Sequence, residues 1–263
     1  MHWDTTVKLA ENMTLECIYP AKGFLTQTEW FKIKSGQRES IAIYNPDIGV
    51  LIRDQYEGRV SFLNSTESRN DITLYFHNAS GADVGYYSCF LHTFPYGHWE
   101  KLVRVVATDG FEIVESPEKQ VVSTTGKNIT LTCPLPVDSP IERITWEKIQ
   151  PHQIDLLSKC DLPLGQSDAS KFHREIWSSC SKDMPVSIII LYQVLVSDSA
   201  IYQCEFQTLK AQNASCLIKL TVNSDDHDSL YILFIVGGII ILLVLISLIS
   251  MAIFFFYKKT TTK

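Results

Sequence analysis

The sequence predicts an all-β fold, two tandem β-sandwiches followed by one transmembrane α-helix. A pattern of Cys, Trp, Arg, Asp, Tyr and Cys occurs twice, with an offset of 115 or 116 positions, and such a repeat indicates a duplicated unit. Short segments of alternating apolar and polar residues precede residue 223 and are typical of strands. An uncharged run of 28 residues near the C-terminus is long enough to cross a bilayer as a helix.

The repeat is clearest around Asp83-x-Gly85-x-Tyr87-x-Cys89. In immunoglobulin sandwiches a Tyr two residues before the second core Cys hydrogen-bonds back to the backbone, and a Trp packs on the core disulfide. The 71 residues between Cys17 and Cys89 leave room for the two extra strands of a variable-type sandwich. The pattern therefore predicts two immunoglobulin-like domains, the first variable-type, with an Arg–Asp pair at the bottom of each. The matched residues are Cys17, Trp30, Arg59, Asp83, Tyr87 and Cys89, and then Cys133, Trp146, Arg174, Asp198, Tyr202 and Cys204.

Alternation and turn residues place the strands and the domain boundaries. The first domain is expected at 1–108, the second at 109–222 and an acidic stalk at 223–229, with Thr108-Asp109-Gly110 as a short joint. Strands of the first domain are expected within 7–19, around Trp30, and at 40–44, 59–62, 72–76 and 101–106; those of the second domain are expected at 129–133, 144–147 and 186–191.

The uncharged run at 230–257 is expected to be the membrane span, with a cytoplasmic tail at 258–263. Three Asp residues precede the run and Lys258-Lys259 follow it, so the positive-inside rule predicts a single-pass type I protein of the plasma membrane. A lipid-anchor signal is the alternative. Met1-His2-Trp3-Asp4 does not resemble a secretory signal peptide, so we expect that the signal peptide is missing from the sequence.

Seven cysteines fit an oxidising compartment, where small sandwiches are stabilised by disulfides. The repeat predicts the pairs Cys17–Cys89 and Cys133–Cys204. Cys160 and Cys180 are expected to form a third bridge within the second domain. Cys216 is left over, and it is expected either to be free or to link two chains.

Charge and the remaining motifs exclude several functions. A net charge of −6 argues against nucleic acid or heparin as a partner, because both need a basic surface. The histidines and cysteines show no metal spacing, and no nucleophile or phosphate-loop motif is present, so we expect no enzyme, metal or cofactor. Five glycosylation sequons all precede the apolar run and support a glycosylated ectodomain; they are Asn12, Asn64, Asn78, Asn128 and Asn213.

Beyond Cys89 the chain continues into Thr93-Phe94-Pro95-Tyr96-Gly97, in which Pro and Gly predict a turn. A Phe at such a tip either packs on its own loop or anchors another protein. Thr93-Phe94-Pro95 resembles the T-F/Y-P loop of the nectins, the nectin-like molecules and their immune receptors. Ala42 to Gly49 resembles the Ala-x6-Gly motif of that family, and Leu25-Thr26-Gln27 resembles its third motif, with Leu as a departure. The stretch from Trp146 to Leu157 is similar to the receptors of this family on natural killer and T cells.

The resemblance implies an adhesion and costimulatory receptor that binds the poliovirus receptor and nectin-type ligands on apposed cells. It implies that two first domains dock face to face, with the tip aromatic of each entering a pocket beside the partner's Ala-x6-Gly segment. Lateral association with an integrin or a signalling chain is a further implied partnership. Two alternatives remain: a form that binds ligand without signalling, because only six residues follow the span, and a cytokine or Fc receptor. The implied ligand-binding residues are Leu25, Thr26, Gln27, Ala42, Gly49, Thr93, Phe94 and Pro95.

Overall fold

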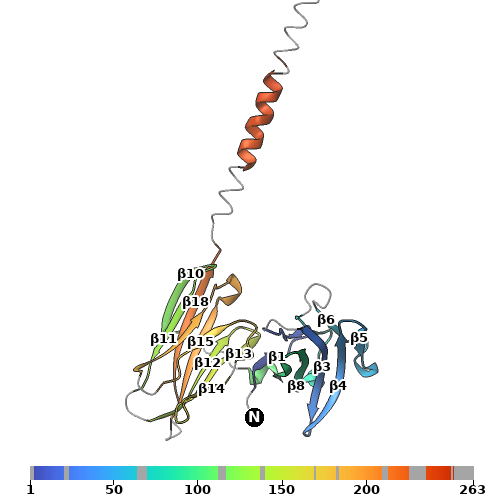
Figure 1. Cartoon of the computed structure of the whole chain (residues 1–263), viewed down its shortest axis with the longest axis vertical. Helices are drawn as coiled ribbons and strands as arrows, with labels where there is room; N and C mark the ends of the chain where they lie inside the picture. Colours follow the sequence, from blue (N-terminus) through green and yellow to red (C-terminus); the bar gives the residue numbers. More distant parts are fainter. Residues whose placement is uncertain are drawn as a thin grey trace, which may run out of the picture. The chain divides into compact units, whose positions relative to one another are not determined.

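The computed structural model describes residues 3–20, 24–63, 70–111, 117–136, 140–168, 170–181, 184–208, 213–224, 235–249 and 251. Except for residues 235–249 and 251, these residues form strands, turns and short 3-10 helices (Figure 1). The described strands gather around two separate hydrophobic cores, one before and one after residue 111. We call the two groups the first and the second sandwich. The immunoglobulin-like, all-β architecture predicted from the sequence is confirmed.

The first sandwich has two sheets with the disulfide-linked core between them. One sheet has the order β2-β7-β6, and the strands of the other follow the order β1-β9-β8-β3-β4-β5. Buried residues alternate with half-exposed ones along β9 and β7, because one face of each strand packs on the core. The strands are β1 (Thr5–Lys8), β2 (Met13–Leu15), β3 (Phe24–Lys34), β4 (Gln37–Asn45), β5 (Gly49–Ile52), β6 (Val60–Phe62), β7 (Leu74–Phe76), β8 (Gly85–Phe94) and β9 (Gly97–Val106).

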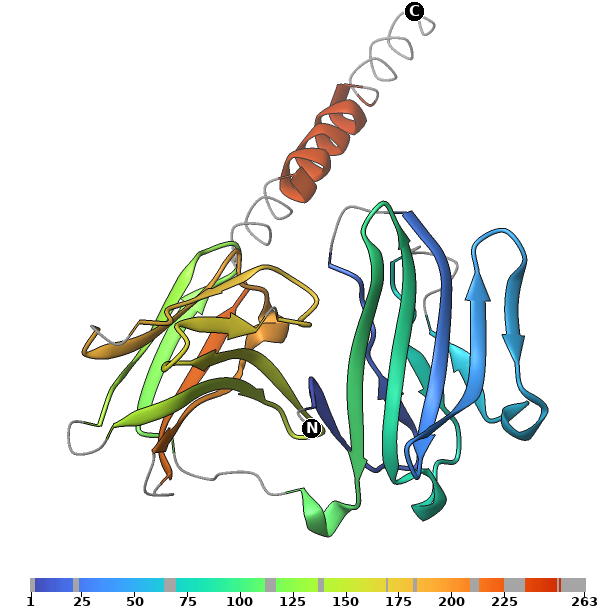
Figure 2. The same ribbon diagram turned by 60° about the horizontal axis from the view of Figure 1, so that its bottom comes forward.

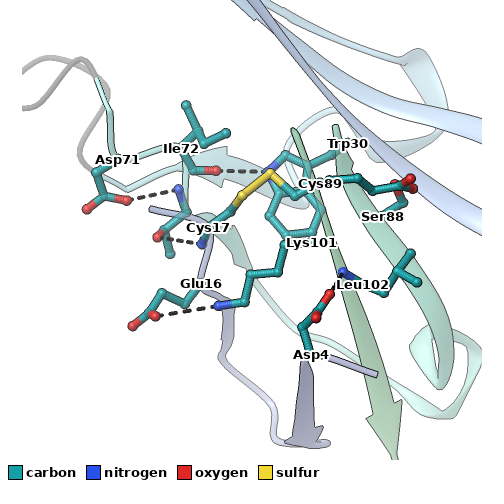
Figure 3. Close-up of a disulfide and its surroundings, with 12 residues drawn as sticks. Asp4, Glu16, Cys17, Trp30, Asp71, Ile72, Ser88, Cys89, Lys101 and Leu102 are labelled. Carbon is teal, nitrogen blue, oxygen red and sulfur yellow. Dashed lines mark hydrogen bonds and ion pairs between the residues drawn. A yellow bond between two sulfur atoms is a disulfide. The ribbon is translucent and has the colours of Figure 1, made fainter. Parts of the chain in front are cut away.

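The core of the first sandwich is built around the Cys17–Cys89 disulfide (Figure 3). Trp30 is completely buried beside it, and its indole N–H donates a hydrogen bond to the backbone oxygen of Ile72 at 2.8 Å. This bond joins the two sheets, because Trp30 belongs to β3 and Ile72 lies just before β7. The disulfide and the indole predicted from the sequence are both confirmed here.

The second sandwich repeats this arrangement. One sheet has the order β11-β16-β15, and the other has the order β10-β18-β17-β12-β13, with β14 paired to β13. Trp146 is again buried and donates its indole N–H to the Ser187 hydroxyl at 2.9 Å. The strands are β10 (Lys119–Thr124), β11 (Ile129–Pro134), β12 (Ile141–Ile149), β13 (Gln153–Asp161), β14 (Gln166–Asp168), β15 (Ile176–Ser178), β16 (Val186–Leu191), β17 (Ala200–Thr208) and β18 (Asn213–Asn223).

The predicted Tyr and Arg–Asp anchors are present in both sandwiches. The Tyr87 hydroxyl donates to the backbone oxygen of Asp83 at 2.6 Å, and burial raises the pKa of this tyrosine. The Asp83 carboxylate pairs with Arg59 at 2.8 Å. In the second sandwich, Tyr202 donates to the backbone oxygen of Asp198 at 2.9 Å, and Arg174 pairs with the Asp198 carboxylate at 2.6 Å.

One disulfide differs from the prediction. Cys160–Cys180 forms as predicted, but Cys133 is bonded to Cys216 instead of Cys204. Cys204 is a buried free thiol, so the prediction that Cys216 would be free or would link two chains is also wrong. The reason is the register of the sheet: Cys204 on β17 and Cys216 on β18 are direct cross-strand neighbours, so both can approach Cys133. Burial raises the pKa of the Cys204 thiol to about 12, which keeps it protonated near neutral pH.

Strand β1 also pairs with a strand of the second sandwich. It runs parallel to β9 and antiparallel to β13, where Thr5 lies opposite Asp155. The Thr5 hydroxyl donates to the Asp155 carboxylate at 2.8 Å, and both side chains are buried. The two sandwiches therefore share backbone pairing as well as the chain that joins them.

A second contact between the sandwiches is a hydrogen bond between Glu16 and His173. Glu16, beside the first disulfide, lies 3.6 Å from the buried Lys101 ammonium and 3.3 Å from a ring nitrogen of His173 (Figure 3 shows Glu16 and Lys101). Burial alone would raise the pKa of Glu16, but the hydrogen bond from His173 and the charge of Lys101 lower it to about 2. Glu16 is therefore ionised over the whole physiological range.

The expected membrane span at 230–257 lies only partly within the described residues. Residues 235–249 and 251 are helical, and they belong to a different unit of the structure from the sandwiches. Within the described residues, no helix is both long and apolar enough to cross a membrane. The other residues of the predicted span, and the predicted tail at 258–263, are outside the described residues.

Candidate ligand-binding tip

The β8–β9 hairpin presents two exposed aromatic rings at its turn. Phe94 is 66% exposed and Tyr96 is 64% exposed, and Pro95 between them follows a cis peptide bond. The Thr93 hydroxyl donates to the backbone oxygen of Gly97 at 2.9 Å and closes the turn beneath the rings. Gly97 has a φ of 81°, a conformation that favours glycine. The local sequence thus forms a tight turn whose large apolar side chains have no cover from their own sandwich.

Thr26 and Asn45 connect this hairpin to its neighbour. The Thr26 hydroxyl donates to the backbone oxygen of His92 on β8 at 3.0 Å. The Asn45 amide donates to the backbone oxygen of Thr26 at 3.2 Å, and its own oxygen accepts from the N–H groups of Asp47 and Ile48. Asn45 therefore shapes the β4–β5 turn and ties it to β3, which pairs with β8. These bonds fix the two turns at the same end of the sheet.

The β4–β5 turn carries a second group of exposed apolar residues. Ile48 is 88% exposed, and Val50 and Leu51 on the edge strand β5 are about half exposed. Gly49 between them has a φ of 101°, with no atom within 4 Å of the position that a Cβ would occupy. Figure 2 shows this hairpin in light blue beside β3. We use the name apolar tip for Ile48, Val50, Leu51, Phe94 and Tyr96.

Three residues of the predicted motifs belong to the interior of the sandwich. Ala42 is completely buried in the core, and Leu25 and Thr93 are also buried. Ala42 therefore cannot contact a partner's ring directly, so a pocket beside the Ala-x6-Gly segment would be lined by neighbouring residues. The structure exposes Gly49, Phe94, Pro95 and Thr26, and half-buries Gln27, so the surface part of the predicted site is smaller than the motifs suggest.

Next to the hairpin tip, the outer face of β8 and β9 is aromatic and polar. His92 lies opposite His98, with ring centroids 4.6 Å apart, and Phe90 contacts both rings. The guanidinium of Arg38 lies over the Phe90 ring at 5.6 Å and pairs with Glu100 at 2.8 Å. This arrangement gives a face with aromatic rings and an Arg–Glu ion pair below the tip, suited to a partner with polar and aromatic groups.

The sequence pattern did not identify several members of this surface. These residues lie within or beside the motifs: Ile48, Val50, Leu51 and Tyr96. No alternation of apolar and polar residues distinguishes them, because an edge strand and a turn are exposed on both sides. One sequence feature could have identified them: a large apolar residue follows a turn-forming proline in both places, Ile48 after Pro46 and Tyr96 after Pro95. Such residues in a turn have no core to join.

The predicted glycosylation sites lie at the surface where they are described. Asn12, Asn78 and Asn128 are exposed. Asn64 is outside the described residues, and Asn213 begins β18, with a side chain that is also outside them. Within the described residues, no group of three side chains suited to hold a metal ion occurs.

The sequence of the chain is similar to those of known immunoglobulin-domain proteins. Residues 2–108 match the model of the immunoglobulin V-set domain. The chain is 49% identical over 235 residues to the CD226 antigen of Macaca mulatta, covering 89% of this chain and 69% of that protein. It is 29% identical over 108 residues to Nectin 1b of Danio rerio, covering 37% of this chain and 20% of that protein. It is 26% identical over 171 residues to Nectin-4 of Xenopus tropicalis, covering 64% of this chain and 32% of that protein.

The V-set match and the disulfide-linked sandwich define an immunoglobulin-superfamily protein. The chain belongs to the family of the CD226 antigen, the DNAX accessory molecule, which is a family of immune adhesion receptors and not of enzymes.

Proposed function

We propose that this chain is a cell-surface adhesion and costimulatory receptor of natural killer and T cells that binds the poliovirus receptor and nectin-type ligands on apposed cells. The proposal includes two tandem immunoglobulin-like domains outside the cell, a short stalk and one membrane span. The similarity of the chain to the CD226 antigen and to two nectins supports this proposal.

The observation that carries the proposal is the apolar tip. Five large apolar side chains are exposed at one end of the V-set sheet, although each would be more stable if removed from water. The turns that present them are fixed by Thr93, Thr26 and Asn45. A rigid, exposed aromatic group is typical of a protein–protein hot spot, because little conformational entropy is lost when a partner covers it.

The proposed docking mode follows from this placement. Phe94 projects from the hairpin, so its ring can enter a pocket on the partner, while Ile48 and the open backbone at Gly49 receive an apolar group in return. Arg38 and the two histidines beside the tip supply polar contacts at the rim. Such an interface gains most of its affinity at the tip and its orientation from the rim.

The experiment that tests the proposal measures ligand binding by the full chain on transfected cells. Phe94→Ala should weaken the binding of soluble poliovirus-receptor or nectin ectodomains by about 2 kcal/mol, roughly thirtyfold in Kd. The fold should stay intact, because Tyr87 and Cys89 anchor β8 within the core. Antibody staining of a terminal epitope tag gives the surface level of each variant.

Leu164→Ala is the matched control, because Leu164 is an equally exposed apolar residue of a turn in the second sandwich. Its ligand titration should coincide with that of the unmodified chain. Equal affinity of the Phe94→Ala variant and the unmodified chain would remove the tip from the mechanism. A loss caused by Leu164→Ala alone would move the contact to the second sandwich.

A further inference from the structure

The outer face of the β11-β16-β15 sheet in the second sandwich is unusually apolar. Thr130, Ile190 and Trp177 lie side by side across the three strands, and Trp177 is 46% exposed. Ile188 lies two residues before Ile190 on the same face and is only half buried. Tyr192 follows the end of β16 and is exposed. The outer face of such an antiparallel sheet is commonly solvated and polar, so an indole and two isoleucines here need an explanation.

The equivalent face of the first sandwich is less apolar, with one aromatic residue and no isoleucine. There Thr14, Tyr75 and Ser61 lie side by side across β2, β7 and β6. Thr14 corresponds to Thr130 with the same offset of 116 positions as the core cysteines. The position of Trp177 is therefore occupied by a serine in the first sandwich, and the apolar face is specific to the second.

A glycosylation sequon borders the apolar face. Thr130 is the third residue of Asn128-Ile129-Thr130, and Asn128 lies two residues earlier on the same side of the chain. Ile129 lies opposite Leu191, so one further step in the antiparallel register brings Asn128 opposite Tyr192. Asn128 is exposed, and its side-chain oxygen accepts a hydrogen bond from the Gln193 N–H at 2.9 Å. This bond holds the amide in one orientation, and it uses the side-chain oxygen and not the side-chain nitrogen of Asn128.

We propose that Asn128 carries an N-linked glycan whose first N-acetylglucosamine covers this face and packs on Tyr192, Ile190 and Trp177. In the transfer step, the Asn128 amide nitrogen forms a bond to C1 of the sugar and loses a proton. The bond from C1 to the diphosphate of a lipid-linked oligosaccharide breaks, and the diphosphate leaves with the electron pair. A pyranose ring has one face rich in C–H groups, which packs well on an aromatic ring. The proposal rests on the cell-surface location given under the proposed function, because the transfer occurs in the secretory pathway.

The test compares four forms of the full chain made in mammalian cells: unmodified, Thr130→Val, Trp177→Ala and the double variant. Thr130→Val removes the sequon and keeps Asn128 with its hydrogen bond to Gln193. We expect Thr130→Val to lower the Tm of the second sandwich by about 2–4 °C. Trp177→Ala should lower it by a similar amount in the glycosylated chain, and the double variant should lose no more than either single variant. Additive losses in the double variant would overturn the proposal.

Two further measurements make the result specific to the sugar. Glycopeptide mass spectrometry must find Asn128 occupied, and an unmodified Asn128 would also overturn the proposal. Trimming the glycan enzymatically to its first N-acetylglucosamine should leave the Tm of the unmodified chain unchanged, because only the first sugar touches the face; a fall as large as that of Thr130→Val would contradict this packing.

Thr14→Val is the matched control, because it removes the equivalent sequon of Asn12 over the face of the first sandwich that has no tryptophan or isoleucine. Its Tm shift should stay below about 1 °C. Ligand binding at the apolar tip should be unchanged in all these variants. The ligand affinity of Phe94→Ala therefore tests the proposed function, and the additivity of the Tm losses in the double variant separately tests the packing of the glycan.

Discussion

The two sandwiches are built on the same internal anchors and differ in what they place around them. Each buries a tryptophan, a tyrosine bonded to the backbone, and an Arg–Asp pair at matching positions. The first sandwich exposes Phe94 and Ile48 at the end of one sheet. The second exposes Trp177 on the outer face of the other sheet. The duplicated anchors maintain the fold, so the surfaces are free to differ.

A second difference lies within the cores. In the first sandwich, Cys89 on β8 lies opposite Lys101 on β9 and forms the inter-sheet disulfide. In the second, the matching Cys204 on β17 lies opposite Cys216 on β18, and Cys216 makes the bond. Around its inter-sheet disulfide the second sandwich therefore has three cysteines, Cys133, Cys204 and Cys216, where the first has only Cys17 and Cys89.

Removing one disulfide-bonded core cysteine from each sandwich should produce the largest difference in stability between them. Cys89→Ser leaves Cys17 without a partner, and we expect the free energy of unfolding to fall by about 2–5 kcal/mol. Cys216→Ser leaves Cys133 beside Cys204, which should take over the disulfide during oxidative folding, so less than half of that loss is expected. Denaturant unfolding gives the free energies, and non-reducing peptide mapping identifies the bonds. A free Cys133 thiol in the folded Cys216→Ser variant would show that Cys204 cannot replace Cys216.

The internal anchors could be predicted from the sequence because each has a fixed spacing. Tyr87 and Asp83 are four residues apart, and their contact is local, so it recurs wherever the spacing recurs. The choice between Cys204 and Cys216 could not be predicted in the same way. It depends on the register between β17 and β18, which places the two cysteines opposite each other. The spacing of residues along the sequence does not determine which residues lie opposite each other on neighbouring strands.

The surface of the candidate site was predicted only in part for a similar reason. Ile41 and Ala42 are consecutive, yet both are buried, because the pairing of β3 with β4 shifts between Trp30 and Phe31. This bulge interrupts the alternation by which exposed and buried residues are distinguished. Phe94 was correctly expected at an exposed turn because Pro95 and Gly97 mark that turn in the sequence.

A smaller expected difference concerns acid stability. Glu16 precedes Cys17, whereas Thr132 holds the matching position before Cys133 and faces outward. The folded-state pKa of Glu16, about 2, lies below its ordinary value of 4.5, so its ionised form stabilises the fold above pH 4.5. This contribution, about 1–3 kcal/mol, should be lost as the pH falls from 4.5 to 2.

Denaturant titrations of the full chain at a series of pH values test this expectation. Glu16→Gln should reduce the slope of stability against pH between 4.5 and 2, because the variant has no carboxylate at this position. The effect should be confined to this acid window. Identical slopes for the variant and the unmodified chain would show that Lys101 and His173 do not hold the carboxylate in its charged form.

The smallest expected effect tests whether the duplicated tyrosines are equivalent. Tyr87→Phe and Tyr202→Phe each remove one buried hydroxyl that donates to an aspartate backbone oxygen. Each should cost about 1–1.5 kcal/mol, because that oxygen loses a hydrogen bond away from water. Native-state hydrogen exchange of the full chain, followed by mass spectrometry, resolves peptides from β8 and β17 separately. Each variant should raise exchange about tenfold in its own sandwich, and much less in the other. An equal rise in both would mean that the pairing of β1 with β13 makes the sandwiches unfold as one unit.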